Sequence, residues 1–209
     1  ELGVVGIAGD RPRAVSTTRW MAAQAAVLHS PRDLSLVVLS SAPDAAEQWS
    51  WTQWLPHTSP QLGQNCIALV GTDAESISRR VTELLTELTR RQEAAKEHGG
   101  LNVLRPDAQV LLVLDGARLL RRVPGVPQLL QEGPAVGIFA LCVDEDERLL
   151  PEECRTAVCW TPESPTRVHL RGYGYEAAGE VLADQVSVEW CERVSRALAP
   201  VRDVSRDDA

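Results

Sequence analysis

The stretch Val4-Val5-Gly6-Ile7-Ala8-Gly9-Asp10-Arg11-Pro12-Arg13-Ala14-Val15-Ser16 runs from a short apolar segment into a glycine and a polar turn. A strand, a glycine loop and a helix N-terminus in this order form the phosphate cradle of nucleotide-binding α/β folds, with the pattern G-x-x-x-x-G-K-[ST]. Counted from Gly9, the first glycine and the hydroxyl residue Ser16 are in register, but the second glycine is Ala14 and the lysine is Val15. The stretch therefore predicts the scaffold of a phosphate loop without its cation.

The other residues of the loop also oppose phosphate binding. Pro12 removes one backbone amide that would donate to a phosphate oxygen, and the carboxylate of Asp10 would repel a triphosphate. Arg11 or Arg13 could replace the lysine from another angle, so a modified nucleotide site stays open as an alternative. We expect a structural turn that keeps the remnants of a phosphate and magnesium site. These remnants are Gly9, Arg11, Arg13, Ser16 and, further along the chain, Asp115.

Asp115 ends the apolar run Leu111-Leu112-Val113-Leu114-Asp115. Four apolar residues closed by an aspartate are typical of the strand that carries the magnesium-side carboxylate in ATPases of this architecture. The next residue, where many such enzymes have a water-activating glutamate, is Gly116. An Asp-Gly pair also makes an ordinary turn after a strand, so the motif is weak by itself.

Apolar runs alternate with helical patterns along the chain, which is typical of β-α-β units around a parallel sheet. The pattern predicts a doubly wound α/β sheet with helices on both faces. Ser16 is expected to cap the first helix, and Asp44 a short helix that ends before Pro56. The expected strands are 4–8, 36–39, 67–70, 110–114 and 136–143, and the expected helices include 16–29 and 74–97.

The C-terminal part has a different pattern. Residues 156–160 and 167–171 predict a β-hairpin at the sheet edge, and 187–199 predict a closing amphipathic helix. We expect one domain over 1–209, in which 155–209 form the hairpin and the helix and 203–209 a linker or tail. The start at Glu1, without a leader, suggests a piece of a longer polypeptide.

Composition excludes some classes of protein. The net charge of −8 disfavours an extended nucleic-acid surface, although DNA binding stays possible. No apolar run reaches the roughly 18 residues that a membrane span needs, so direct membrane insertion is not expected. Five cysteines without C-x-x-C spacing argue against a zinc or disulfide framework and favour a reducing cytoplasm.

Three tryptophans, Trp49, Trp51 and Trp54, lie close together in the sequence. Exposed aromatic side chains often anchor protein interfaces, so these three are candidates for a docking surface. The alternative is that Trp51 and Trp54 simply cover the sheet.

Several segments resemble the FtsK/SpoIIIE family of motor ATPases, and more narrowly the EccC/EssC proteins of type VII secretion. Residues 26–34 resemble the stretch after the family's phosphate loop. The segment Trp51-Thr52-Gln53-Trp54-Leu55-Pro56-His57 resembles the domain that precedes the first ATPase module, and 196–202 resemble its closing helix. The resemblance implies a RecA-like, P-loop-NTPase-like fold. It also implies a membrane-anchored, oligomeric parent with several ATPase modules that use ATP and magnesium.

By this resemblance the chain is a degenerate ATPase-like module, since Ser16 and Asp115 match the family's site but Val15 and Gly116 do not. The module would have no cofactor of its own and would act through contacts with neighbouring ATPase modules and other secretion subunits, on the cytoplasmic side. Whether it hydrolyses ATP stays open, as does a DNA-translocating parent. A further alternative is an unrelated hydrolase with His57 or His169 as base, but no G-x-S-x-G elbow accompanies these histidines.

Overall fold

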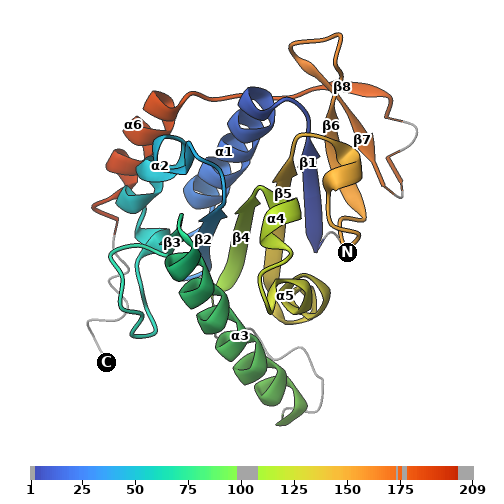
Figure 1. Ribbon diagram of the computed structural model, residues 1–209. Coiled ribbons are helices and arrows are strands. Elements are labelled where there is room, and N and C mark those ends of the chain that lie inside the picture. The colour runs from blue at the N-terminus through green and yellow to red at the C-terminus, as the bar shows by residue number, and fades with distance from the viewer. Residues whose placement is uncertain (1–2, 98–107, 173, 176–177, 202–209) are drawn as a thin grey trace.

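A computed structural model describes residues 3–97, 108–172, 174–175 and 178–201. Eight strands within these ranges form one sheet in the order β3-β2-β4-β5-β1-β6-β7-β8 (Figure 1). The strands from β3 to β6 pair in parallel, and β6-β7 and β7-β8 pair antiparallel. The strands are β1 (Val4–Ala8), β2 (Leu34–Ser40), β3 (Val70–Gly71), β4 (Gln109–Asp115), β5 (Ile138–Asp144), β6 (Thr156–Trp160), β7 (Arg167–Arg171) and β8 (Glu180–Leu182).

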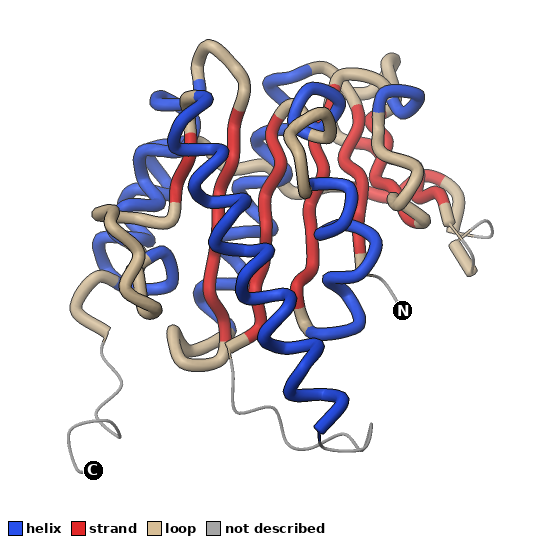
Figure 2. Tube along the Cα trace, turned by 60° about the horizontal axis from the view of Figure 1, so that its bottom comes forward, coloured by secondary structure: helices blue, strands red, loops and turns tan. Residues whose placement is uncertain are grey.

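Helices cover both faces of the sheet, so the predicted three-layer α/β architecture is confirmed. One face packs against α1 (Arg11–Leu28), α2 (Ala45–Trp49), α6 (Val188–Leu198) and the 3₁₀ helices η1 (Ser50–Trp54) and η2 (Pro56–Thr58). The other face packs against α3 (Ala74–Glu97), α4 (Ala117–Leu120), α5 (Val126–Glu132) and η3 (Gly133–Val136). The long helix α3 crosses in front of the strands in Figure 2.

The central strands are apolar on both faces, as strands covered by helices on both sides should be. In β4, Leu112 and Leu114 belong to the cluster under α3, while Val113 belongs to the cluster under α1. The predicted helix over 74–97 is confirmed, and its apolar spacing buries Ile77, Val81, Leu84 and Leu88 against the sheet. The Gly99-Gly100 pair that follows it in the sequence lies outside the described residues.

The predicted start of the first helix is wrong. α1 begins at Arg11, and Asp10 rather than Ser16 takes the N-cap position. Pro12 sits in the first turn, where its missing N–H costs no intrahelical hydrogen bond. The segment that was expected to be a loop is therefore the first turn of a helix.

The predicted strand over 67–70 is also wrong in extent. Only Val70 and Gly71 pair with β2, and the side chain of Ile67 is 91% exposed. Ile67 therefore lies on the surface although it belongs to an apolar run, because the strand pairing of this segment starts only at Val70.

The predicted hairpin is confirmed, since β6 and β7 pair with Cys159 opposite His169. It is not the edge of the sheet, because β8 pairs with the outer side of β7. Helix α6 follows, and Ser187 caps it by accepting a hydrogen bond from the Trp190 amide at 3.2 Å. The tail expected over 203–209 lies outside the described residues.

Polar side chains of α1 hold the segment that precedes α6. The Ser16 hydroxyl donates to the Val186 carbonyl at 2.9 Å, and the Thr17 hydroxyl donates to the Asp184 carbonyl at 3.2 Å. The Arg19 guanidinium also donates to Val186, at 2.9 Å. The beginning and the end of the described chain are thus joined directly. No helix of the described residues has the length and apolar character of a membrane span.

Candidate functional site

The candidate site lies at the carboxyl ends of β1, β2 and β4, the edge at which open α/β sheets bind ligands. Helix α1 begins just beyond β1, Ser41 follows β2, and Asp115 is the last residue of β4. The structure therefore brings together the N-terminus of α1 and Asp115, which the sequence predicted as two parts of one site.

Both carboxylate oxygens of Asp115 are engaged by protein donors. Arg11 donates from Nη1 to Oδ1 at 2.7 Å and from Nη2 to Oδ2 at 3.0 Å. The Ser40 hydroxyl donates to Oδ2 at 2.7 Å, and Trp49 Nε1 donates to the same oxygen at 2.9 Å. The Asp115 side chain is fully buried. A buried carboxylate needs such partners, because an unpaired charge in this environment would be strongly destabilising.

Arg11 bridges two carboxylates. Besides Asp115 it contacts Asp44, to which Nε donates at 3.1 Å and Nη2 at 2.5 Å. The hydrogen bond to Asp115 is the main cause that raises the pKa of Arg11, with Asp44 adding to it against the opposing effect of burial. Burial acts to raise the pKa of Asp44, but the hydrogen bonds and charge of Arg11 outweigh it and lower that pKa. The guanidinium is thus held as a fixed internal cation.

The other predicted site residues point elsewhere. Arg13 forms an ion pair with Asp10 at 2.9 Å, and its Nη1 donates to the Ser164 carbonyl at 2.7 Å. The hydroxyl of Ser16 is used by Val186. Of the five predicted residues, only Arg11 and Asp115 therefore share contacts in the described part of the chain.

Several amides of the turn are used by backbone carbonyls, since the Gly9 amide donates to Asp144 at 3.3 Å. The Arg13 and Ala14 amides donate to the Asp10 carbonyl at 3.1 and 3.0 Å, which closes the first turn of α1. Gly9 has φ +150°, and a Cβ there would lie 2.5 Å from Cβ of Trp160. The packing of Trp160 is therefore enough to explain a glycine at this position. A close approach of phosphate is not needed to explain it.

Gly116 has a packing reason of its own. It has φ +86°, a left-handed conformation that favours glycine, and a Cβ there would lie 2.3 Å from Ser41 Oγ. The position where a catalytic glutamate was sought is therefore shaped for a residue without a side chain.

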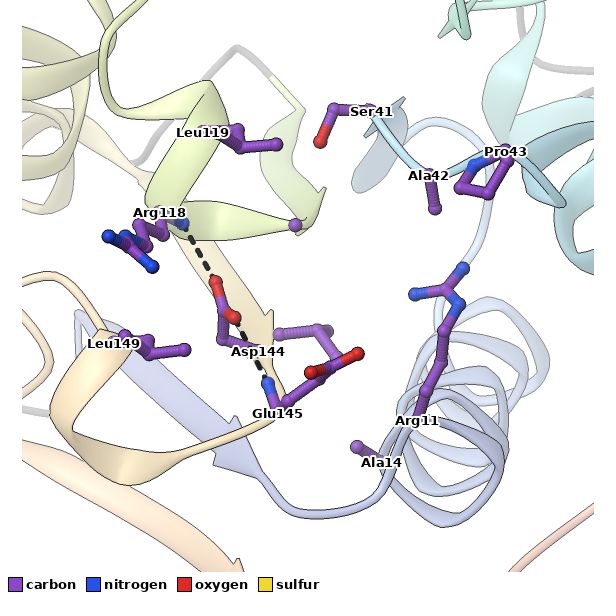
Figure 3. A pocket seen from close by; sticks show the side chains of 12 residues that line it. Arg11, Ala14, Ser41, Ala42, Pro43, Arg118, Leu119, Asp144, Glu145 and Leu149 are labelled. Atoms are coloured by element: carbon purple, nitrogen blue, oxygen red, sulfur yellow. Dashed lines mark hydrogen bonds between the residues drawn. The ribbon is translucent and has the colours of Figure 1, made fainter.

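A cavity of about 320 Å³ lies beside this site. Figure 3 shows Arg11 on one side of it, and Arg118 and Asp144 on the other. The Arg118 amide donates to Asp144 Oδ2 at 2.9 Å, and the Glu145 amide donates to Oδ1 at 3.0 Å. The lining thus combines two guanidinium groups with two carboxylates, a mixed charge that suits no simple anion.

The tryptophans separate into two kinds. Trp49 and Trp51 are each only 1% exposed and pack in the core with ring centroids 6.4 Å apart, so the prediction of a docking surface is wrong for them. Trp54 is 38% exposed, and the Arg196 guanidinium lies 4.0 Å from its ring centroid. Only Trp54 keeps the character of an interface candidate.

The two histidines considered as bases have different surroundings. His57 is buried, its Nε2 lies 2.9 Å from the His29 carbonyl, and burial lowers its pKa. His169 is half exposed, with Nε2 3.9 Å from Glu147 Oε2. Cys159 lies opposite His169, but its thiol donates to Glu147 Oε2, and burial raises its pKa to about 12, so it is not an activated nucleophile. Neither histidine therefore supports the hydrolase alternative.

Three solved structures of type VII secretion ATPases resemble this arrangement of strands and helices. ATPases 2 and 3 of Thermomonospora curvata EccC, solved in complex with a signal sequence peptide, align over 95% of this chain with a TM-score of 0.71 and 18% identity. The chain has the fold of these ATPase domains. ATPases 2 and 3 of EssC from Geobacillus thermodenitrificans align over 94% with a TM-score of 0.69 and 14% identity. The cytoplasmic domain of the T. curvata protein aligns over 95%, with a TM-score of 0.69 and 18% identity.

The chain spans less than half of each of these structures, namely 41%, 43% and 27% of their lengths. In sequence it matches no protein-family model and no curated protein. The similarity to the EccC and EssC ATPase domains is therefore one of fold, and the expected RecA-like architecture is confirmed on that ground.

Three residues of the site were not predicted as parts of it. Asp44 was expected only to cap a helix, and Ser40 and Trp49 had no assigned contact with Asp115. Ser40 directly follows the apolar run of β2, so its place at the carboxyl edge could have been found from the strand pattern. The pairing of Asp44 with Arg11 spans 33 residues and left no local signal.

Proposed function

We propose that this chain is a non-catalytic ATPase-like module of a larger ATP-driven translocase, of the type VII secretion kind. It acts through protein contacts on the cytoplasmic side, within a parent that is membrane-anchored and oligomeric. The observation that carries the proposal is the pairing of Arg11 with Asp115, because it places a protein cation against the carboxylate that would face magnesium.

The contacts at the site do not suit a magnesium–nucleotide complex. A magnesium ion requires near-octahedral oxygen ligands, and both oxygens of Asp115 already accept hydrogen bonds. Val15, at the position of the phosphate-binding lysine, is 1% exposed and packs in the core under α1. A single substitution would therefore not restore nucleotide binding, because the engaged Asp115 and the buried Val15 are separate obstacles.

Isothermal titration of the chain with ATP and magnesium tests the proposal. We expect no saturable heat for the unaltered chain. Arg11→Ala would free Oδ1 of Asp115, while Ser40 and Trp49 still donate to Oδ2. The matched variant Arg13→Ala removes a neighbouring guanidinium whose hydrogen bond and ion pair are with Ser164 and Asp10. Micromolar ATP binding by the unaltered chain that Asp115→Asn abolishes would overturn the proposal.

The cavity beside Arg11 favours a second candidate, a nucleotide-binding module with a modified phosphate loop. Its volume of about 320 Å³ falls at the low end of ligand-site volumes. In this case ATP or GTP would give saturable heat that Arg118→Ala weakens, since Arg118 lines the far side of the cavity. Two carboxylates on the same lining argue against it, as they would repel a phosphate chain.

Contacts with neighbouring modules are expected to use the exposed side of α6 and η1. Trp54 and Trp190 are 38% and 37% exposed there, and η1 packs against α6. Trp54→Ser should weaken association with the neighbouring ATPase module, measured by biolayer interferometry. Leu62→Ser is the control, because Leu62 is 67% exposed but lies outside these helices. Equal effects of the two changes would argue against this surface.

A further inference from the structure

Glu147, Cys159 and His169 come from three separate elements and meet on one face of the sheet. Cys159 in β6 lies directly opposite His169 in β7, so their side chains share a face of the hairpin. Glu147 belongs to η4 (Glu147–Leu149), the turn that follows β5. One ligand atom from each residue lies within 4.8 Å of the others.

The separations are close to those of a tetrahedral metal site. Cys159 Sγ lies 3.4 Å from Glu147 Oε2, and His169 Nε2 lies 3.9 Å from the same oxygen. Zinc bond lengths of about 2.3 Å to sulfur and about 2.1 Å to nitrogen or oxygen place tetrahedral ligand pairs roughly 3.4 to 3.6 Å apart. The third pair, Cys159 and His169, lies within 4.8 Å, so the half-exposed imidazole would have to move toward the other two groups to complete the geometry.

A neighbouring arginine orients the carboxylate. Arg171 lies two residues beyond His169 on the same face of β7, and its Nε contacts Glu147 Oε1 at 2.5 Å. That contact uses one carboxylate oxygen and leaves Oε2 directed at the cysteine and the histidine. Partners that fix a ligand in this way are a regular part of metal sites.

Binding of a divalent cation would displace one proton. Cys159 is a thiol that donates to Glu147 Oε2 at 3.4 Å, so zinc has to release that proton before the thiolate and the Glu147 carboxylate supply two negative charges. Arg171 pairs with Glu147 and offsets part of this charge, and His169 contributes a neutral nitrogen. Asp146 is next to Glu147 but forms an ion pair with Arg148 at 2.7 Å, so it does not compete as a ligand. A thiolate, an imidazole and a carboxylate together are donors that zinc accepts.

We propose that Glu147, Cys159 and His169 bind one zinc ion, with a fourth position open to water or to a side chain of a partner. The ion joins η4 to the β6-β7 hairpin. Through Leu149, which lines the cavity beside Arg11, it also fixes one wall of that cavity. The zinc site is independent of the proposed function and uses none of the residues that donate hydrogen bonds to Asp115.

Titration with zinc alone tests the site, with a chromophoric chelator as competitor. We expect one zinc ion per chain and a rise in the temperature of unfolding that a stronger chelator reverses. His169→Gln is the main variant, because the side chain is half exposed and its loss should leave the fold intact. It should weaken zinc binding at least about tenfold, the loss that even an outer-shell change causes.

Cobalt(II) supplies a second readout. The cobalt-loaded chain should show the visible bands of a tetrahedral site and a thiolate charge-transfer band, and Cys159→Ser should remove the latter. Cys66→Ser and His29→Gln are the controls, since both residues lie outside the group of three. Absence of saturable zinc binding, or binding that survives His169→Gln but is lost in Cys66→Ser, would overturn the proposal.

Discussion

Arg11 donates two hydrogen bonds to the two oxygens of Asp115, at 2.7 and 3.0 Å, across 104 residues of sequence. In a nucleotide-binding fold these two positions belong to the start of the phosphate loop and to the magnesium-side strand. In this chain the two positions are joined by an internal ion pair. What the pair contributes to stability can be measured.

Arg11→Ala should destabilise the chain, because it leaves the buried carboxylate of Asp115 without its cation. Removing one partner of a buried ion pair costs about 3–5 kcal/mol, and the 26% exposure of the Arg11 side chain lowers our expectation to about 2–4 kcal/mol. Urea unfolding measures the difference. Arg13→Ala is the control and should cost less, about 1–2 kcal/mol, because Arg13 contacts Asp10, the Ser164 carbonyl and the Trp160 ring but no buried carboxylate. If both variants lost the same free energy of unfolding, the ion pair of Arg11 with Asp115 would have no special contribution to stability.

Trp49→Phe removes the indole N–H that donates to Asp115 Oδ2. Oδ2 keeps its bonds from Ser40 and Arg11, so the cost is that of one hydrogen bond to a charged group, about 1.5–3 kcal/mol, and the smaller ring adds a cavity. The free energy of unfolding should fall by at least that amount. Trp54→Phe makes the same change on a half-exposed ring and should cost under about 1 kcal/mol. If Trp49→Phe left the free energy of unfolding unchanged, the hydrogen bond from Trp49 to Asp115 would not contribute to stability.

Gly116→Ala should be more destabilising than an alanine at another glycine of similar conformation. At φ +86° alanine costs about 1–2 kcal/mol for the left-handed backbone, and its Cβ would also meet Ser41 Oγ at 2.3 Å. Gly63→Ala is the matched control, because Gly63 has φ +76° with no atom within 4 Å of the added Cβ. Thermal unfolding of the two variants isolates the steric contribution. A smaller loss at Gly116 than at Gly63 would show that Ser41 moves away freely.

The buried His57 predicts a pH dependence of stability. Burial lowers its pKa from the ordinary value of 6.5, so below about pH 6.5 the unfolded chain binds a proton that the folded chain does not. The free energy of unfolding should therefore decrease as the pH falls from 7 toward 5. In His57→Gln this part of the decrease should be absent, whereas His169→Gln should keep it. Parallel pH profiles for the unaltered chain and His57→Gln would contradict the argument.

The sequence predicted the features that depend on local pattern. The period of Ile77, Val81, Leu84 and Leu88 defined α3, because one helix face is buried along its length. The apolar run ending at Asp115 located the aspartate at the carboxyl edge of the sheet. Both features follow from hydrophobic periodicity, which a single sequence displays.

Features that depend on distant partners were missed. Whether residues 11–14 form a loop or a helical turn depends on what binds their amides, and here the Asp10 carbonyl accepts from the Arg13 and Ala14 amides. The short helices α4 and α5 were not predicted, because their few turns carry little periodic signal. The tryptophans showed an aromatic cluster, but the sequence could not tell that Trp49 faces Asp115 and Trp54 faces solvent.

The hydrogen bonds from Ser16 and Arg19 to Val186 span 170 and 167 residues. During synthesis, the hydroxyls of Ser16 and Thr17 do not meet their carbonyl partners until residues 184–186 have been made, whereas Arg19 also has an earlier partner in Gln48. Docking of the segment before α6 is therefore a late event in folding, with the high closure cost of a long loop. A truncation just before residue 184 would keep all eight described strands but would leave the hydroxyls of Ser16 and Thr17 without the carbonyls that accept from them.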